Sequence, residues 1–309
     1  MSTNPRVTVV VPCYNHARYL GEAIASVIAQ TYPAWEAIII DDGSPDDTAA
    51  VAQTLIAAYP AASIQLIRQP NQGLARSRNT AIAQARGEYI LPLDADDTIA
   101  PTMLAATVTA LDADPRAGFA YVDALRFGAE TTRLRAAPYD RDLLRVDCML
   151  MASTLFRRAA WAQTEGFCPT MAYQGYEDWD FWISLAERGW TGVHIAKPLL
   201  HYRRMGGSML GNAQRHDLEL RAEVVLRHPA LYDADWIHWA RRVTRVAQGN
   251  GGGLPNAAAR VAFLAYLNLV RRAWPPLLPK MLLRPLFWRV PIGVQGSLRS
   301  IGRALRVSR

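Results

Sequence analysis

The sequence predicts an α/β fold with a mostly parallel central sheet flanked by helices, followed by a helical, basic C-terminal extension. Residues 7–12 form a continuous apolar and β-branched run, typical of a strand that is buried on both faces. Strand-like and helix-like segments then alternate as far as residue 93, which favours parallel strands joined by right-handed crossovers. Half of the 309 residues are hydrophobic, enough for one large core with an appendage.

The individual elements follow from periodicity and from turn residues. In the first part of the chain we expect strands at residues 7–12, 35–40, 64–68 and 89–93. We expect one helix at 17–30, a second that begins at Pro45, a third that ends at Ala85, and a fourth at 101–111. Later strands are expected at 119–122, 149–156, 193–195 and 199–202, with 130–145 irregular and a helix at 177–188. From residue 207 onward we expect helices, including one at 261–270.

Polar side chains follow the expected strands at their carboxyl ends. Tyr14 and Asn15 come after the first strand, Asp42 after the second, and Asp94 and Asp96 after the fourth. Ligands of open parallel sheets bind at this edge, so these residues are candidates for one site. The first strand is not followed by a glycine-rich dinucleotide or phosphate loop, which argues against dehydrogenases and P-loop enzymes.

The stretch 93–97 places three carboxylates within four positions. Such carboxylates repel one another unless a cation offsets their charge. Asp94 and Asp96 alternate on an extended backbone and so point the same way, which suits a hard divalent ion. The alternative is that the acids cap a following helix. We expect Asp97 to act as this cap.

Composition places the chain in a reducing compartment and separates a basic tail from the body. The three cysteines, Cys13, Cys148 and Cys168, suggest neither a disulfide ladder nor a metal knuckle. We find neither a signal peptide nor an apolar run of roughly 20 residues, so a cytoplasmic protein is expected. The net charge is +7, yet residues 251–309 hold ten basic and no acidic residues, so the body is net acidic.

The basic tail suggests a partner surface. Residues 274–309 mix leucines and aromatic residues with Lys280 and several arginines, a pattern typical of segments that lie on an anionic membrane. The alternatives are a helical bundle packed on the catalytic domain or a dimer contact. A nucleic-acid partner is disfavoured because the body is acidic and has no recognition motif. We predict a catalytic domain at 1–215 and a helical region at 216–309.

Seven motifs, in order, resemble the family 2 glycosyltransferases, which are inverting enzymes of the Rossmann-like GT-A fold. The motifs lie at residues 11–16, 30–32, 41–44, 71–79, 87–90, 93–97 and 176–182. The resemblance covers roughly residues 6 to 205. It implies transfer of a sugar from a UDP- or dTDP-sugar to a hydroxyl of a glycan or lipid-linked acceptor. It also implies a nucleotide-sugar half at 1–100 and an acceptor half at 101–215.

The resemblance implies roles for individual residues. The base and phosphates of the donor would contact Pro12, Tyr14, Asn15, Asp42, Arg78, Asp94, Ala95, Asp96 and Arg203. Asp96 and Asp94 would form the DxD motif and hold Mg²⁺ or Mn²⁺, and the acceptor would contact Tyr176, Glu177 and Trp179. Many members carry a histidine after the Tyr202-Arg203 pair, whereas this chain has Arg204, so we assign no histidine ligand.

Asp178 would be the catalytic base in this comparison. An acceptor hydroxyl needs a nearby carboxylate to take its proton, and the aromatic residues around Asp178 could desolvate it and raise its pKa. The alternative is that Glu177 and Asp178 only charge a helix N-terminus. Two other functions remain open: a non-catalytic nucleotide-sugar or glycan binder on the same fold, and a nucleotidyltransferase, which the missing glycine-rich loop disfavours.

Overall fold

The structure is a computed structural model that describes residues 4–128, 131–204 and 213–273. The chain divides into two compact units. The first, here called the sheet unit, consists of residues 1–141, 149–169 and 177–206. The second, the helical unit, consists of residues 142–148, 170–176 and 207–309. Each unit is described by itself below.

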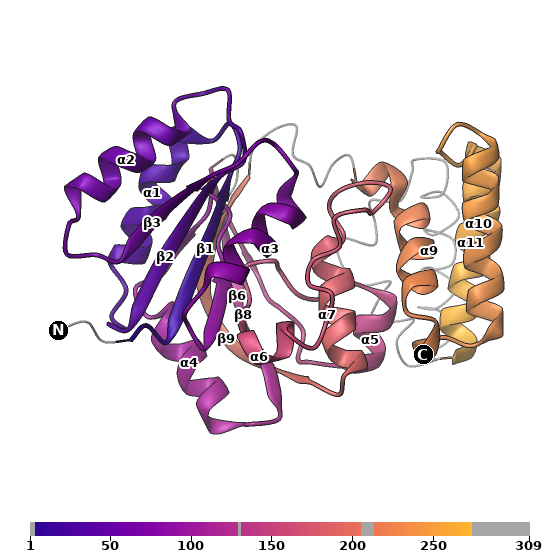
Figure 1. The fold of residues 1–309 in the computed structure, drawn as a ribbon. Coiled ribbons are helices and arrows are strands. Elements are labelled where there is room, and N and C mark those ends of the chain that lie inside the picture. The colour runs from indigo at the N-terminus through magenta and orange to yellow at the C-terminus, as the bar shows by residue number, and fades with distance from the viewer. Residues whose placement is uncertain (1–3, 129–130, 205–212, 274–309) are drawn as a thin grey trace. The chain divides into compact units, whose positions relative to one another are not determined.

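The amino-terminal half of the sheet is parallel, as the sequence predicts (Figure 1). Its four strands lie in the order β3 (Ile64–Arg68), β2 (Trp35–Asp41), β1 (Val7–Cys13) and β4 (Tyr89–Pro92). Val7 pairs with both Trp35 and Tyr89, so β1 lies between two partners. All of β1 and β4 is buried, which explains their unbroken apolar sequences.

Helices connect these strands and bury one face each. The connecting helices are α1 (Ala17–Ile28), α2 (Thr48–Ala58) and α3 (Leu74–Gln84), and α4 (Met103–Ala113) follows β4. In α1, Leu20, Ile24 and Val27 are fully buried at helical spacing, while Arg18 and Ala25 face solvent. Because each connection returns to the same end of the sheet, the carboxyl ends of β1, β2 and β4 share one edge.

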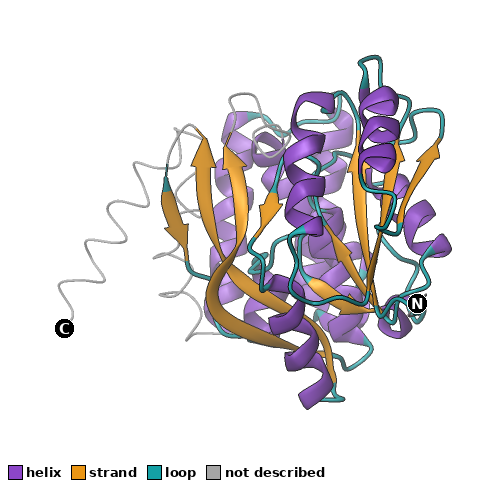
Figure 2. Ribbon diagram, turned by 90° about the vertical axis from the view of Figure 1, so that its left-hand side faces the viewer, coloured by secondary structure: helices purple, strands orange, loops and turns teal. Residues whose placement is uncertain are grey.

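The second half of the sheet is mixed, as the secondary-structure view shows (Figure 2). The order continues through β8 (Leu155–Arg157), β6 (Ala117–Gly128), β9 (Thr191–Arg204) and β5 (Thr98–Ile99), and β7 (Thr132–Leu134) pairs with β6. β8 is shorter than the expected strand at 149–156. The sheet unit also contains α6 (Arg158–Trp161) and α7 (Glu177–Glu187).

The two strands expected at 193–195 and 199–202 form one strand, β9. Pro198 lies between them and pairs with Asp123, where the register with β6 shifts on both sides. Proline cannot donate a ladder hydrogen bond, and a bulge accommodates it without ending the strand. The expected break is therefore an irregularity inside a continuous strand.

The expectation that Asp97 caps a helix is wrong. Thr98 and Ile99, which follow it, form the short strand β5, and α4 begins only at Met103 after Thr102. Asp97 is buried, and its Oδ1 accepts a hydrogen bond from the backbone N–H of Arg203 at 2.8 Å. The carboxylate therefore joins the acidic loop to β9.

The helical unit is built around a buried arginine. Its elements are α5 (Arg141–Val146), η1 (Gln214–His216), α9 (Asp217–Arg227), η2 (Pro229–Leu231), α10 (Ala234–Gly249) and α11 (Asn256–Ala273). The first residue of α5, Arg141, belongs to the sheet unit. Arg221 donates to Asp217, to Asp147 at 3.3 Å and to the hydroxyl of Tyr266 at 3.0 Å. These bonds explain why residues 142–148 belong with the C-terminal helices.

Within the described ranges 4–128, 131–204 and 213–273, none of the helices has the length and apolar character needed to cross a bilayer. Residues 274–309, where the basic amphipathic tail is expected, lie outside those ranges.

Candidate active site

The carboxyl ends of β1 and β2 place Tyr14, Asn15 and Asp42 at one edge of the sheet. Tyr14 is half-exposed, with 50% of its surface accessible, so its ring is available to a ligand. Asn15 has a positive φ of 56°, and its backbone N–H donates to Ser44 Oγ at 3.2 Å. This bond ties the loop after β1 to the loop after β2. Pro12 is buried just before these residues.

Asp42 is buried and fixes the start of α3. Its Oδ1 accepts hydrogen bonds from Gln69 Nε2 at 2.7 Å and from the backbone N–H of Gln72 at 2.9 Å. Its Oδ2 accepts one from the N–H of Gly73, also at 2.9 Å. Each carboxylate oxygen has two acceptor sites, so Oδ2 keeps one for a further donor. The predicted contact with a nucleotide base is compatible with this remaining site.

Arg78 links the end of β4 to the start of α7. Only 1% of its surface is exposed, and it donates to Asp94 Oδ1 at 2.8 Å and to Glu177 Oε1 at 3.0 Å. Its guanidinium also lies 5.3 Å from the ring centre of Phe167. One buried cation thus holds two carboxylates that are 83 positions apart in the sequence. Hydrogen bonds between charged groups are stronger than neutral ones, which makes this a rigid connection.

Asp178 lies directly beside this connection, at the first turn of α7. It is partly exposed, and its Oδ1 accepts a hydrogen bond from the backbone N–H of Trp179 at 2.7 Å. Burial and the neighbouring charge of Glu177 raise the pKa of Asp178 to about 7. A carboxylate with a pKa near neutrality can both accept and return a proton, which is the property of a general base.

Asp94 and Asp96 fit a divalent cation. Asp96 is half-buried, and its side chain has no hydrogen-bond partner in the part of the chain that the structure describes. Burial and the nearby charge of Asp94 raise the pKa of Asp96, so a bound cation would relieve an existing repulsion. Among the described residues there is no cluster of three or more His, Cys, Asp or Glu placed to bind a metal. The expected binding of a metal by Asp94 and Asp96 therefore stays a prediction; Mg²⁺ held by two carboxylates commonly completes its shell with phosphate and water.

Arg203 supports this acidic loop from β9. Its Nε donates to the backbone oxygen of Asp96 at 2.8 Å, and its Nη2 donates to Glu22 at 2.6 Å. The guanidinium lies between the rings of Tyr19 and Phe127, 4.7 and 4.3 Å from their centres. The predicted contact of Arg203 with a diphosphate stays a prediction, because these atoms are engaged by the protein.

The residues expected to contact an acceptor, Tyr176, Glu177 and Trp179, are less exposed than Tyr14. Trp179 has 2% of its surface exposed, and Glu177 is buried against Arg78. Ala95 is likewise buried between the two acids. Tyr176 belongs to the helical unit, where its hydroxyl donates to Asp217. Within the sheet unit, Glu177 and Trp179 thus hold Asp178 in place, and their direct contact with an acceptor stays a prediction.

Two supporting residues, Glu22 and Gln69, were not found from the sequence. Glu22 lies on α1 and binds Arg203, which is 181 positions away. No local sequence pattern indicates a contact between two residues so far apart in the chain. Gln69 follows β3, so the rule that site residues lie at the carboxyl ends of strands could have identified it.

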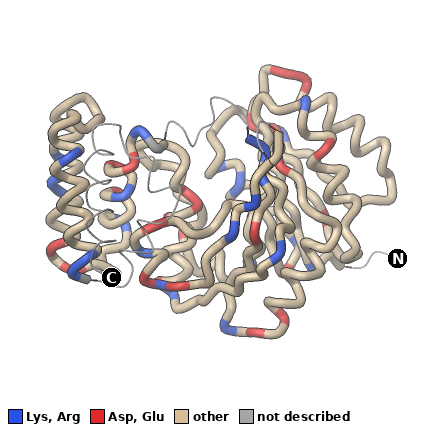
Figure 3. The backbone as a smooth tube through the Cα atoms, turned by 180° about the vertical axis from the view of Figure 1, so that it is seen from behind, with Lys and Arg blue, Asp and Glu red and all other residues tan. Residues whose placement is uncertain are grey.

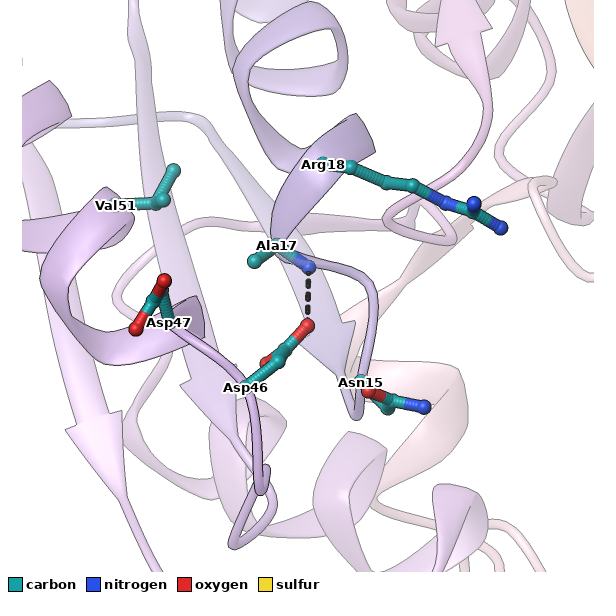
Figure 4. A pocket seen from close by; sticks show the side chains of 6 residues that line it. All are labelled: Asn15, Ala17, Arg18, Asp46, Asp47 and Val51. Atoms are coloured by element: carbon teal, nitrogen blue, oxygen red, sulfur yellow. Dashed lines mark hydrogen bonds between the residues drawn. The ribbon is translucent and has the colours of Figure 1, made fainter.

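A hollow of about 560 Å³ lies at the amino-terminal ends of α1 and α2 (Figure 4). Its lining residues are Asn15, Ala17, Arg18, Asp46, Asp47 and Val51. Asp46 accepts hydrogen bonds from Thr48 and from the backbone N–H of Ala17 at 2.9 Å, and these bonds outweigh burial and lower its pKa. Asn15 is the one predicted site residue among the lining residues.

Sequence comparison identifies the family. Residues 8–171, more than half of the chain, match the family described as Glycosyl transferase family 2. The chain belongs to glycosyl transferase family 2. It is therefore a transferase, and its predicted family and enzyme class are confirmed.

Relatives of this family 2 chain include bacterial proteins of varied length. A putative glycosyltransferase of Bacillus subtilis, EpsE, is 30% identical over 210 residues, which span 66% of this chain and 74% of EpsE. Chondroitin synthase of Escherichia coli is 29% identical over 189 residues, which span 60% of this chain but 27% of the synthase. The O-antigen biosynthesis protein RfbC of Myxococcus xanthus is 28% identical over 72% of this chain and 18% of RfbC.

Solved structures confirm the predicted fold. The family 2 chain superposes on Staphylococcus aureus TarS, residues 1–349, in complex with UDP-GlcNAc, with a TM-score of 0.61 and 17% identity. That match covers 98% of this chain and 92% of the other. The mannosyltransferase PcManGT of Pyrobaculum calidifontis, in complex with GDP-Man and Mn²⁺, gives a TM-score of 0.61 at 20% identity, covering 99% and 87% of the two chains. The shared fold is the GT-A fold.

Proposed function

We propose that this family 2 glycosyltransferase moves a sugar from a nucleoside-diphosphate sugar to a hydroxyl group, with inversion at the anomeric carbon. The acceptor class we propose is a glycan or a lipid-linked glycan. The observation that supports this proposal is the buried contact of Arg78 with both Asp94 and Glu177, because it links one proposed metal ligand to the residue next to the proposed base.

The donor half of the site would be the carboxyl edge of β1, β2 and β4. Tyr14 presents an exposed ring on which a base can stack, and Asp42 retains an acceptor site for a base N–H. Two structural neighbours were solved with UDP-GlcNAc and with GDP-Man. We propose a uracil or thymine nucleotide, since each offers an N–H to Asp42.

Asp94 and Asp96 would hold Mg²⁺ or Mn²⁺. A bound divalent ion neutralises charge on a diphosphate leaving group. The protein's part is to keep both carboxylates in place, through Arg78 on Asp94 and through Arg203 on the backbone of Asp96. One neighbouring structure contains Mn²⁺, which supports this choice of ion.

Asp178 would take the proton of the acceptor hydroxyl. Its raised pKa, near 7, makes it a stronger base than an ordinary aspartate while leaving much of it ionised at neutral pH. A single base opposite the leaving group favours direct displacement, and direct displacement inverts the anomeric carbon. No second carboxylate is then needed as a nucleophile.

The relatives and the basic C-terminal segment support an acceptor class and a cellular location. Relatives named chondroitin synthase and O-antigen biosynthesis protein favour a polysaccharide or a surface glycan. We propose a cytoplasmic protein that lies on the inner face of the cell membrane through residues 274–309, because this segment is basic and amphipathic. Fractionation of cells that express the chain with and without residues 274–309 tests the location.

A non-catalytic binder on the same fold is the alternative function. It would bind a nucleotide-sugar but would release no nucleoside diphosphate from it. The pKa of Asp178 favours the enzyme, because a binder has no use for a carboxylate tuned toward neutrality.

The proposal is tested first on the donor half. A thermal-shift screen of nucleotide-sugars, with and without Mn²⁺, identifies the donor, and calorimetry then measures its affinity. Replacing Asp96 with alanine should abolish the Mn²⁺-dependent part of that affinity, because the half-buried carboxylate is a proposed ligand. Glu165→Gln, which removes an exposed carboxylate of the sheet unit, is the matched control. Unchanged affinity in Asp96→Ala would refute the ligand assignment.

A further inference from the structure

The exposed face of α10 carries a stripe of basic side chains. His238, Arg241, Arg242 and Arg245 follow the spacing i, i+3, i+4, i+7, and all four are exposed. The opposite face buries Trp236, Trp239, Val243 and Ala247. The periodicity of the helix therefore sorts its residues into a packed side and a cationic side.

The neighbouring helix α11 also carries exposed basic residues. Trp239 Nε1 donates to the backbone oxygen of Ala262 at 2.9 Å, and Arg272 lies 3.1 Å from Asp235, so the two helices pack antiparallel. On α11, the exposed residues include Arg260, Val261, Leu264, Arg271 and Arg272. We call the exposed residues of α10 and α11 named here the arginine face. Figure 3 marks the lysine and arginine positions along the backbone in blue.

The charge of this face is not balanced within the helical unit. Asp235 is the last acidic residue of the sequence, and thirteen lysines and arginines follow it. Arg241, Arg242 and Arg245 make no ion pair with any residue in the described ranges. Arg241 and Arg245 are four positions apart, and like charges at that spacing destabilise a helix. Because these three arginines repel one another and form no ion pair among the described residues, they indicate an external, anionic partner.

The apolar members of the face decide which kind of partner fits. Val261 and Leu264 are among the few large apolar side chains described as exposed, at 54% and 37%. A surface that combines arginines with exposed aliphatic groups suits the boundary between lipid head groups and acyl chains. The residues after α11 do not neutralise the face, because 274–309 contain seven basic and no acidic residues.

We propose that the arginine face binds the surface of an anionic phospholipid bilayer. This extends the proposed membrane contact from residues 274–309 to two helices of the folded unit, and it does not depend on the transfer chemistry. The phosphate groups of the lipid would accept hydrogen bonds from the guanidinium groups, and Val261 and Leu264 would enter the head-group boundary.

The test is vesicle co-sedimentation of the full chain. Wild type should bind phosphatidylcholine vesicles that contain phosphatidylglycerol and should not bind phosphatidylcholine alone. Each basic residue near such a surface strengthens partitioning about fivefold, so the triple variant Arg241→Gln/Arg242→Gln/Arg245→Gln should bind roughly 100-fold more weakly. The triple lysine variant at the same positions should retain most of the binding, because it retains the charge.

The matched control removes three positive charges from the exposed surface of the sheet unit: Arg116→Gln/Arg135→Gln/Lys197→Gln. It should bind vesicles within about threefold of wild type if the position of the charges matters. Equal weakening in both glutamine variants would refute the proposal, because vesicle binding would then depend only on the net charge of the protein and not on the arginine face. Tighter binding of wild type to duplex DNA than to the anionic vesicles would also refute it. Donor affinity, measured without vesicles, should be unchanged in all variants, so failure here is distinct from failure of the proposed function.

Discussion

Arg78 is the residue on which the geometry of the candidate site depends. It is the charge partner of both Asp94 and Glu177, and it is almost completely buried. A buried charge that loses its partner is far more costly than an exposed one, because neither water nor another ion replaces the lost contact. The site is therefore sensitive to any change in this side chain.

Replacing Arg78 with lysine should lower the free energy of unfolding by about 3–5 kcal/mol, because an ammonium group cannot donate to both carboxylates in the same geometry. Urea denaturation measures this loss. Arg76→Lys is the control on the same helix, since Arg76 is exposed, and it should stay within about 0.5 kcal/mol of wild type. Equal stability of the two variants would show that the buried contact with Arg78 does not form.

The pKa of Asp178 predicts a pH-dependent stability. The folded protein holds this proton more tightly than the unfolded chain, since the pKa rises from 3.8 to about 7 on folding. Stability from this group is therefore lost as the pH rises from about 4 to about 7. Asp178→Asn removes that loss, so its melting temperature should exceed that of wild type at pH 8 and the difference should shrink toward pH 5. A difference that is constant between pH 5 and pH 8 would contradict the raised pKa.

The same shift predicts the acid limb of the activity. The base must be ionised to accept a proton, so kcat/KM should fall about tenfold per pH unit below about pH 7. Rates measured between pH 5 and pH 8 at saturating Mn²⁺ check this slope. A flat profile across this range would mean that Asp178 does not take the proton.

At the scale of elements, the strands that carry the site are fixed by close backbone contacts. Gly87 precedes β4 and packs against β1: a Cβ atom placed on it would lie 2.6 Å from the backbone nitrogen of Thr8. Gly21, inside α1, has no atom within 4 Å of the corresponding position. The two glycines therefore predict opposite effects of the same substitution.

Gly87→Ala should destabilise the protein by about 1–3 kcal/mol, because the added methyl group would force β1 and β4 apart. Gly21→Ala should instead stabilise it by about 0.5–1 kcal/mol, since alanine favours a helix and nothing obstructs its methyl group. Thermal unfolding of the two variants under one buffer condition measures both changes. Stabilisation by Gly87→Ala would contradict the described pairing of β1 with β4.

The sequence predicts best those elements that depend on neighbouring residues. The strands from Val7 to Pro92 were predicted because each is a short apolar run that ends in polar residues, and the order of these residues placed Asp42 and Asp94 on one edge. It failed where long-range contacts decide. The sequence predicts Asp97 as a helix cap, because an aspartate in front of a helical run is a common capping pattern. Its hydrogen-bond partner is instead the backbone N–H of Arg203, 106 positions away.

For the candidate site, the sequence supplied the residue types but not their connections. Glu177 was expected to face an acceptor, and no pattern indicated that Arg78, 99 positions earlier, binds it. Tyr176 was expected in the aromatic surroundings of Asp178, whereas its hydroxyl binds Asp217 in the helical unit. Such pairs arise from contacts within each unit, between Arg78 of α3 and Glu177 of α7 and between Tyr176 and Asp217, which a single sequence does not encode as a local signal.

At the scale of the whole molecule, we propose that a donor half and a proton-accepting half act together in one transferase. The fold and the family establish a glycosyltransferase of family 2. The division of labour within it is the central claim: Asp94 and Asp96 serve the donor, and Asp178 serves the acceptor. This claim separates donor binding from transfer, so the two can be measured independently.

The most direct measurement compares these two quantities in Asp178→Asn, once the donor has been identified. Transfer should fall by at least about a thousandfold, because the acceptor hydroxyl loses its base, while calorimetric affinity for the donor with Mn²⁺ should stay within a fewfold of wild type. Transfer at a rate near that of wild type would contradict the assignment of Asp178 as the base.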